Sequence, residues 1–143
     1  MKPIALTGQH EYYGQAFPLA VEVAVGTLGE ACAWAAGAAA ELSRQTVEYG
    51  AVLVRGMPLA SPDDFDAVVS ALGYPNFSYA GSLSNAYRIN HTPRVFSANE
   101  APADVNIFLH HEMAQTPFYP SKLIFFCQAA AEEGGATPVC RSD

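Results

Sequence analysis

The order of two hydrophobic periods along the chain is the feature that most constrains its fold. Apolar side chains recur at helical spacing over residues 28–48, where Trp34, Ala38 and Leu42 lie four apart. Alanine is the best helix former and fills much of this stretch. Segments with the apolar, β-branched character of strands come later, at residues 51–54, 105–113 and 121–128. Helices followed by strands predict an α+β fold, or a barrel preceded by N-terminal helices.

A second helix is predicted to begin at Ser61. This residue is a good N-cap, Pro62 fits the first helical position, and acidic residues follow in the first turn. The helix is expected to end near Gly73. Residues 74–104 are rich in Pro, Gly, Asn and Ser, which predicts loops with brief strands such as residues 94–97.

Length and charge exclude several classes of protein. The chain has 143 residues, of which 50% are hydrophobic and 15% charged, so it can bury a core and is expected to form one domain. Seven basic residues against fourteen acidic ones give a net charge of -7. Nucleic-acid-binding proteins normally present a basic face, and anionic lipid attracts basic segments. We therefore expect neither nucleic acid nor membrane as a partner.

The cysteines and the N-terminus bear on the compartment. The longest strongly apolar stretch, residues 31–40, has about half of the ~20 residues needed to span a bilayer. Residues 1–10 lack the pattern of a secretory signal. Cys32, Cys127 and Cys140 are odd in number and far apart, which argues against a disulfide framework or a structural zinc site. These features predict a cytoplasmic protein.

The most informative short motif is His110-His111-Glu112. Residues two apart in a strand point to the same face, so His110 and Glu112 would project together toward one metal ion. A histidine nitrogen and a carboxylate oxygen, with positions left open, suit non-haem iron(II). The motif also fits an ordinary surface pair. A register shifted by one residue would turn His111 inward instead.

The sequence around this motif resembles the taurine dioxygenase (TauD/TfdA) family. The family pattern has an H-x-D/E strand, a proline-led strand that ends near Phe/Tyr-Cys, and a G-G-x-T turn. The matching segments, from about residue 45 to the C-terminus, are residues 50–56, 110–114, 117, 119–127 and 133–138. The resemblance implies an iron(II)- and 2-oxoglutarate-dependent oxygenase. It also implies a double-stranded β-helix core, a jelly roll of the clavaminate synthase-like type.

The resemblance assigns roles to individual residues. It implies that His110 and Glu112 bind the metal. Thr137 resembles the threonine that hydrogen-bonds a carboxylate of 2-oxoglutarate, and Asn106 resembles a residue near cosubstrate and substrate. Arg94 lies in a loop region where the family often contacts substrate. The alternatives are an ordinary turn hydroxyl for Thr137, a loop-edge residue for Asn106 and a surface arginine for Arg94.

One departure from the family pattern concerns its distal half. The family takes a third metal ligand from a distal histidine and a 2-oxoglutarate salt bridge from an arginine further on. Here no histidine follows His111, and Arg141 comes too early to match. His91 lies in a polar loop and is a candidate third ligand without a matching family position. We therefore expect residues 1–143 to form one partial domain that lacks the family's C-terminal half.

These observations predict two functions from different classes. The first is an oxygenase that hydroxylates a small organic molecule and whose present chain is inactive alone. Related halogenases have a small residue in place of the carboxylate, so Glu112 disfavours halogenation but leaves desaturation and ring closure open. The alternative is a truncated, non-catalytic paralogue that acts as a binding or interaction module. Unpaired strand edges of a partial barrel would also favour pairing with another copy of the chain.

Overall fold

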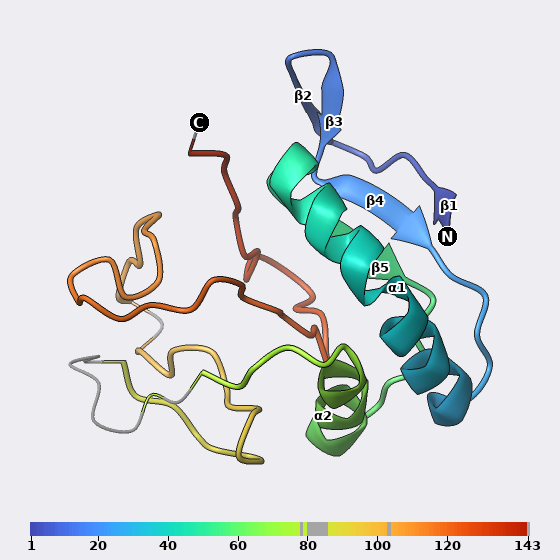
Figure 1. Cartoon of the computed structure of the whole chain (residues 1–143). Helices are drawn as coiled ribbons and strands as arrows, with labels where there is room; N and C mark the ends of the chain where they lie inside the picture. The colour runs from blue at the N-terminus through green and yellow to red at the C-terminus, as the bar shows by residue number, and fades with distance from the viewer. Residues whose placement is uncertain (78, 80–85, 103, 143) are drawn as a thin grey trace. The chain divides into compact units, whose positions relative to one another are not determined.

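The computed structural model describes residues 1–77, 79, 86–102 and 104–142, and it divides into two compact units (Figure 1). The first unit comprises Met1–Leu59, Ala67–Gly73 and Arg141–Asp143; the second comprises Ala60–Asp66 and Tyr74–Cys140. The strands are β1 (Lys2–Pro3), β2 (His10–Tyr12), β3 (Gln15–Phe17), β4 (Leu19–Glu22) and β5 (Val52–Arg55). The helices are α1 (Leu28–Tyr49) and α2 (Pro62–Ala71).

All regular strands among the described residues lie in the first unit. A three-stranded sheet has the order β1-β4-β5, with β1 antiparallel and β5 parallel to β4, and β2 pairs with β3 in a hairpin. In the parallel pair, Leu19 lies opposite Val52 and Glu22 opposite Arg55. Parallel neighbours need a crossover connection, which α1 provides. The predicted strand at residues 51–54 is thus confirmed as β5, whereas sequence analysis had assigned no strand to β1–β4.

Helix α1 begins and ends where the sequence provides the matching signals. The Thr27 side chain accepts a hydrogen bond from the Glu30 backbone N–H, and the Glu30 carboxylate accepts one from the Thr27 N–H at 3.0 Å. This capping box satisfies two N–H groups that no helical carbonyl can reach. Gly50 follows the last turn with φ of 80°. The helix predicted for residues 28–48 is therefore confirmed. Among the described residues, no helix is long and apolar enough to cross a membrane.

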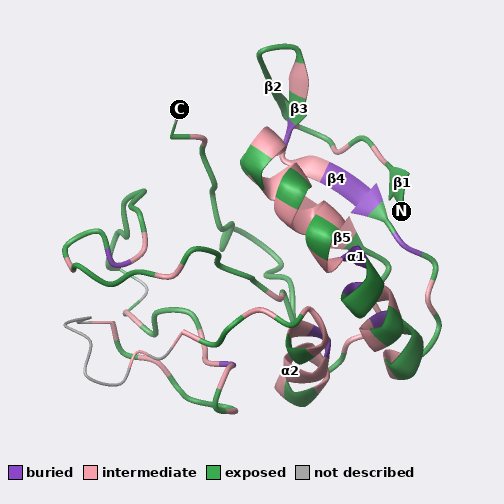
Figure 2. Ribbon diagram, in the orientation of Figure 1, coloured by how far each residue is buried: buried purple, intermediate pink, exposed green. Residues whose placement is uncertain are grey.

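The core of the first unit is built on small side chains of α1 (Figure 2). Ala31 and Ala35 are completely buried and pack with Val68 of α2. Larger apolar residues contact this cluster from the surrounding segments: Val25, Leu28, Cys32, Trp34, Met57, Leu59, Ala71 and Leu72. Trp34 and Leu42, predicted on the apolar face, are only half-buried. Alanine at the closest point of approach lets the elements pack tightly without a void.

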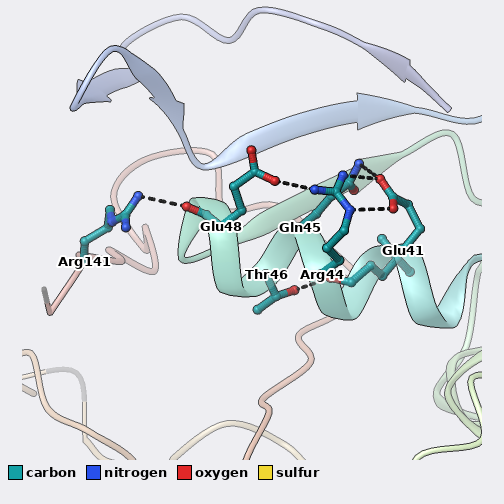
Figure 3. Close-up of polar contacts among 7 residues, drawn as sticks. Glu41, Arg44, Gln45, Thr46, Glu48 and Arg141 are labelled. Carbon is teal, nitrogen blue, oxygen red and sulfur yellow. Dashed lines mark hydrogen bonds and ion pairs between the residues drawn. The ribbon is translucent and has the colours of Figure 1, made fainter.

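Charged residues form ion pairs and a hydrogen bond at the last turns of α1 (Figure 3). The Arg44 guanidinium lies between Glu41 and Glu48, with Nη2 2.7 Å from Glu41 Oε1. These pairs are exposed, so solvent and salt screen them and they add little to stability. Arg141 Nη1 donates a hydrogen bond to the Glu48 carbonyl at 3.3 Å. A cationic donor at this place satisfies one of the carbonyls left free at a helix C-terminus.

The second unit contains no regular strand among its described residues. An isolated bridge joins Asn90 and Phe96, and Ser97 N–H donates to the Ile89 carbonyl at 2.9 Å, which makes a short hairpin-like loop. The predicted start of α2 is confirmed, because Ser61 Oγ accepts from the Asp64 N–H and the Asp64 carboxylate accepts from the Ser61 N–H. Of the predicted loop region 74–104, residues 78, 80–85 and 103 lie outside the described part.

The strands predicted over residues 105–113 and 121–128 are wrong for this structure, and residues 94–97 form only the single bridge. No jelly roll is therefore visible in the described part of the chain. A strand persists only when a neighbouring strand binds its backbone N–H and C=O groups. No described segment pairs with these residues, and most of their apolar side chains stay exposed, with Phe108 at 83%.

The fold makes a specific prediction about Gly56. Its φ is 89°, and a Cβ at this position would lie 2.2 Å from the Val23 carbonyl oxygen. The Gly56→Ala substitution should lower the free energy of unfolding by more than about 2 kcal/mol, since backbone strain and a clash add. In Gly37→Ala, the matched control inside α1, nothing lies near the added methyl group, and stability should rise by about 0.5–1 kcal/mol. Urea unfolding followed by circular dichroism measures both, and equal stabilities would contradict the prediction.

Candidate functional site

His110 and Glu112 lie together in the structure, although not on a strand. His110 Nε2 is 3.9 Å from Glu112 Oε2. The chain turns at this point: Ala114 N–H donates to the His111 carbonyl, and Met113 has φ of 59° and is buried. A positive φ is costly for a residue with a side chain and is found most often where the surrounding structure enforces it. The turn therefore replaces the predicted strand as the element that positions Glu112.

The imidazole of His110 is oriented by a backbone carbonyl two residues earlier in the chain. Nδ1 lies 2.7 Å from the Phe108 carbonyl oxygen. A carbonyl oxygen only accepts, so Nδ1 carries the proton in this contact and the neutral ring keeps a lone pair on Nε2. That lone pair is on the nitrogen that faces Glu112. A hydrogen bond from the other ring nitrogen to a carbonyl is the usual way in which proteins fix a metal-binding histidine.

The second carboxylate oxygen of Glu112 is held by two donors from the preceding loop. The Tyr79 hydroxyl donates to Oε1 at 2.9 Å, and Arg88 Nη2 donates to the same oxygen at 3.1 Å. The side chains of Arg88 and Glu112 are 17% and 14% exposed, so their ion pair is largely removed from water. Breaking one partner of such a pair costs about 3–5 kcal/mol, because the other charge stays buried.

Aromatic rings support both donors. The Tyr79 ring meets Phe77 and Phe96 edge to face, with centroids 5.1 Å and 5.0 Å away. The Arg88 guanidinium lies 4.6 Å above the Tyr79 ring and 5.6 Å from that of Phe96. Edge-to-face rings and a cation on an aromatic face are both favourable arrangements. The two donors therefore have little freedom to leave Oε1.

The surroundings of Tyr79 shift its acid–base equilibrium. Burial raises the pKa of Tyr79 to about 12, and the hydrogen bond to Glu112 and the negative charge of that carboxylate act in the same direction, against the positive charge of Arg88. The phenol therefore stays protonated and remains a donor to Glu112 throughout the neutral range.

The donor set fits part of a metal site. In its neutral form with the proton on Nδ1, His110 presents a lone pair on Nε2, and this nitrogen lies 3.9 Å from Glu112 Oε2. Neighbouring ligands of an octahedral ion, with bonds of about 2.1 Å, lie about 3 Å apart, so the pair would need to approach by about 1 Å. His110 is largely exposed, which permits this movement. Among the described residues, no group of three or more His, Cys, Asp or Glu side chains comes together.

Among the described residues, the other predicted site residues form no hydrogen bond or ion pair with His110 or Glu112. Asn106 and Thr137 are exposed. Arg94 Nε is 3.9 Å from Asp66 Oδ1, so it has an acidic neighbour of its own. His91 is exposed and is not brought to the pair. The roles assigned to Asn106, Thr137 and Arg94 therefore stay predictions.

Sequence reasoning missed the two residues that hold Glu112. Tyr79 and Arg88 precede Glu112 by 33 and 24 positions. Neither belongs to a periodic pattern or motif, since both lie in the loop region rich in Gly, Asn and Ser. A buried carboxylate requires a donor, but the sequence does not say which donor folds back to supply it.

The shifted pKa of Tyr79 predicts a pH dependence of stability. An unfolded tyrosine titrates near 10, whereas Tyr79 titrates at about 12 in the folded chain. Between these values the folded state holds the extra proton, so the free energy of unfolding should fall as pH rises from 10 to 12. Urea midpoints across this range should fall more steeply for the unmodified chain than for Tyr79→Phe. Parallel curves would contradict the prediction.

Comparison with known proteins shows which family the chain resembles. Residues 15–142 match the family model described as taurine catabolism dioxygenase TauD, TfdA family. A clavaminate synthase-like protein of Arabidopsis thaliana is 48% identical over 95 residues, which cover 66% of this chain and 28% of that protein. The dapdiamide synthesis protein DdaC of Enterobacter agglomerans is 32% identical over 92 residues, or 64% of this chain and 27% of that protein.

The chain thus spans little more than a quarter of the length of these curated relatives. The family match extends from β3 to the C-terminal residues and includes every residue of the His110–Glu112 site described above. We conclude that the chain belongs to the TauD/TfdA family of dioxygenases.

Proposed function

We propose that His110 and Glu112 are two protein ligands of the iron(II) in a 2-oxoglutarate-dependent oxygenase that hydroxylates a small organic molecule. The observation that carries this proposal is the orientation of two Lewis-basic atoms. His110 Nε2 and Glu112 Oε2 face each other, while Nδ1 and Oε1 are each engaged elsewhere. Family membership supports the choice of metal and cosubstrate.

The chain's own residues would do the binding and orienting. Iron(II) with 2-oxoglutarate and dioxygen supplies the chemistry, which yields succinate, carbon dioxide and a hydroxylated substrate. His110 would bind through Nε2 while Phe108 keeps the proton on Nδ1. Glu112 would bind through Oε2. Thr137 and Asn106 would hold the cosubstrate, with the Thr137 hydroxyl donating to a carboxylate oxygen.

A small organic substrate agrees with what the relatives are called. One relative is named for the synthesis of a particular compound, dapdiamide, and the other for its likeness to clavaminate synthase. Glu112 keeps the coordination position that halogenases leave open, which disfavours halogenation and leaves desaturation and ring closure as alternatives to hydroxylation. We propose Arg94 as a contact for an anionic group of the substrate, which would then compete with Asp66.

A non-catalytic binding module is the second candidate. Two observations favour it: the described residues bring together two candidate ligands rather than three, and Phe108 and Leu109 beside them are 83% and 60% exposed. Exposed apolar side chains of this size often mark contact surfaces. The two candidates differ in whether activity depends on Glu112, because only the oxygenase needs this residue as a metal ligand.

The 143-residue chain alone should produce no succinate above background when iron(II), ascorbate and 2-oxoglutarate are added. Two protein ligands bind the metal more weakly than three. A missing arginine also removes charged hydrogen bonds to the cosubstrate that are worth about 1.5–3 kcal/mol each. Turnover that disappears in both His110→Ala and Glu112→Ala would contradict this expectation and show that another group completes the site.

In a protein that contains this chain together with the distal histidine and arginine of the family, Glu112→Ala should abolish succinate formation. The loss should exceed the roughly 10–100-fold change that follows removal of an outer-shell partner. Glu132→Ala, an exposed acidic residue of the same unit, is the matched control and should keep its rate. An undiminished rate in Glu112→Ala would exclude the oxygenase and leave the binding module.

A further inference from the structure

We propose that Arg88 and Tyr79 are positioning residues that hold one oxygen of Glu112 so that only the other oxygen can bind the metal. We call these two residues the Glu112 clamp. The inference rests on the proposed function, because it concerns the same carboxylate. Neither the family pattern nor the sequence says which oxygen of Glu112 is the ligand, or what prevents the other oxygen from competing for the metal.

The contacts separate the two oxygens of Glu112 completely. Oε1 accepts from the Tyr79 hydroxyl at 2.9 Å and from Arg88 Nη2 at 3.1 Å. Oε2 instead lies 3.9 Å from His110 Nε2. An oxygen with two strong donors would lose both contacts by turning toward a metal, whereas Oε2 would lose neither. The carboxylate is therefore set to bind through Oε2 alone.

The clamp is stiff for reasons visible in the structure. The Tyr79 ring is fixed edge to face between Phe77 and Phe96, and the guanidinium of Arg88 lies on the Tyr79 ring. Arg88 and Glu112 are mostly buried, so water competes weakly for these hydrogen bonds. Outer-shell partners of this kind fix the orientation of a ligand and govern metal affinity.

The charge on Arg88 has a further effect. Without Arg88, and before a metal binds, Glu112 would be a largely buried carboxylate with Tyr79 as its neutral donor, which is unfavourable. The guanidinium neutralises it, so the ligand geometry can exist before the metal arrives. His110, at 58% side-chain exposure, is the less buried of the two and is the one that would move toward the ion.

The test uses Co(II) as the probe and the chain as described, with affinity measured by titration calorimetry and coordination by visible absorption. Tyr79→Phe keeps the ring and its contacts but removes the donor, and Arg88→Gln removes the charge. Each should weaken Co(II) binding by about 10–100-fold. Tyr79→Phe should also change the shape of the Co(II) absorption spectrum, because Oε1 is then free to bind.

Two matched controls should keep the affinity and spectrum of the unmodified chain. Tyr87→Phe removes a hydroxyl from a tyrosine that is 70% exposed, and Lys122→Gln removes a cation that lies on the ring of Tyr74 rather than Tyr79. Circular dichroism checks that every variant remains folded. Should Tyr79→Phe unfold, Arg88→Lys serves in its place, since it retains the charge and should bind Co(II) more tightly than Arg88→Gln.

The outcomes separate the clamp from the proposed function. If the unmodified chain binds Co(II) and the clamp variants bind it equally well with the same spectrum, the positioning role of the clamp is contradicted. The proposed metal site is then still supported. If the unmodified chain binds no Co(II), or if His110→Ala leaves binding unchanged, the proposed metal site is contradicted. The proposed role of the clamp is then contradicted as well, because it depends on that site.

Discussion

The hydrogen-bonded ion pair of Glu112 with Arg88 and Tyr79 is the interaction on which the candidate site depends. The described part of the second unit has no regular strands, so no ladder of backbone hydrogen bonds fixes residues 105–113. Glu112 nevertheless has a defined position, because a largely buried carboxylate is stable only where donors meet it. The same contact joins segments that lie 24 and 33 positions apart in the sequence.

The two helices could be predicted well because their signals are local. The alanine-rich period predicted a helix over residues 28–48, within one residue of α1 as observed, and Ser61-Pro62 predicted the start of α2. Such signals operate within a few residues and need no distant partner. The strands β1–β4 escaped prediction because three of them have only two or three residues, too short for an alternating pattern.

The strands predicted for the second unit, which the structure does not show, mark the limit of such local signals. Residues 121–128 have the composition of a strand, but composition provides no hydrogen-bonding partner, and the described chain offers none. The proximity of His110 and Glu112 was predicted from the two-residue period of a strand. The structure achieves it through the turn at Met113, where φ is 59°. The expected pair is therefore present, although the element that positions it differs.

The central claim is that a metal ion binds between His110 Nε2 and Glu112 Oε2 while Tyr79 keeps its contact with Oε1. The most direct measurement is anomalous X-ray diffraction from crystals of a protein that contains this chain, grown without oxygen in the presence of Mn(II) in place of iron(II). The account predicts one anomalous peak about 2.0–2.2 Å from both Nε2 and Oε2, with Oε1 still hydrogen-bonded to the Tyr79 hydroxyl. A peak bonded to Oε1, or no peak beside these two residues, would contradict it.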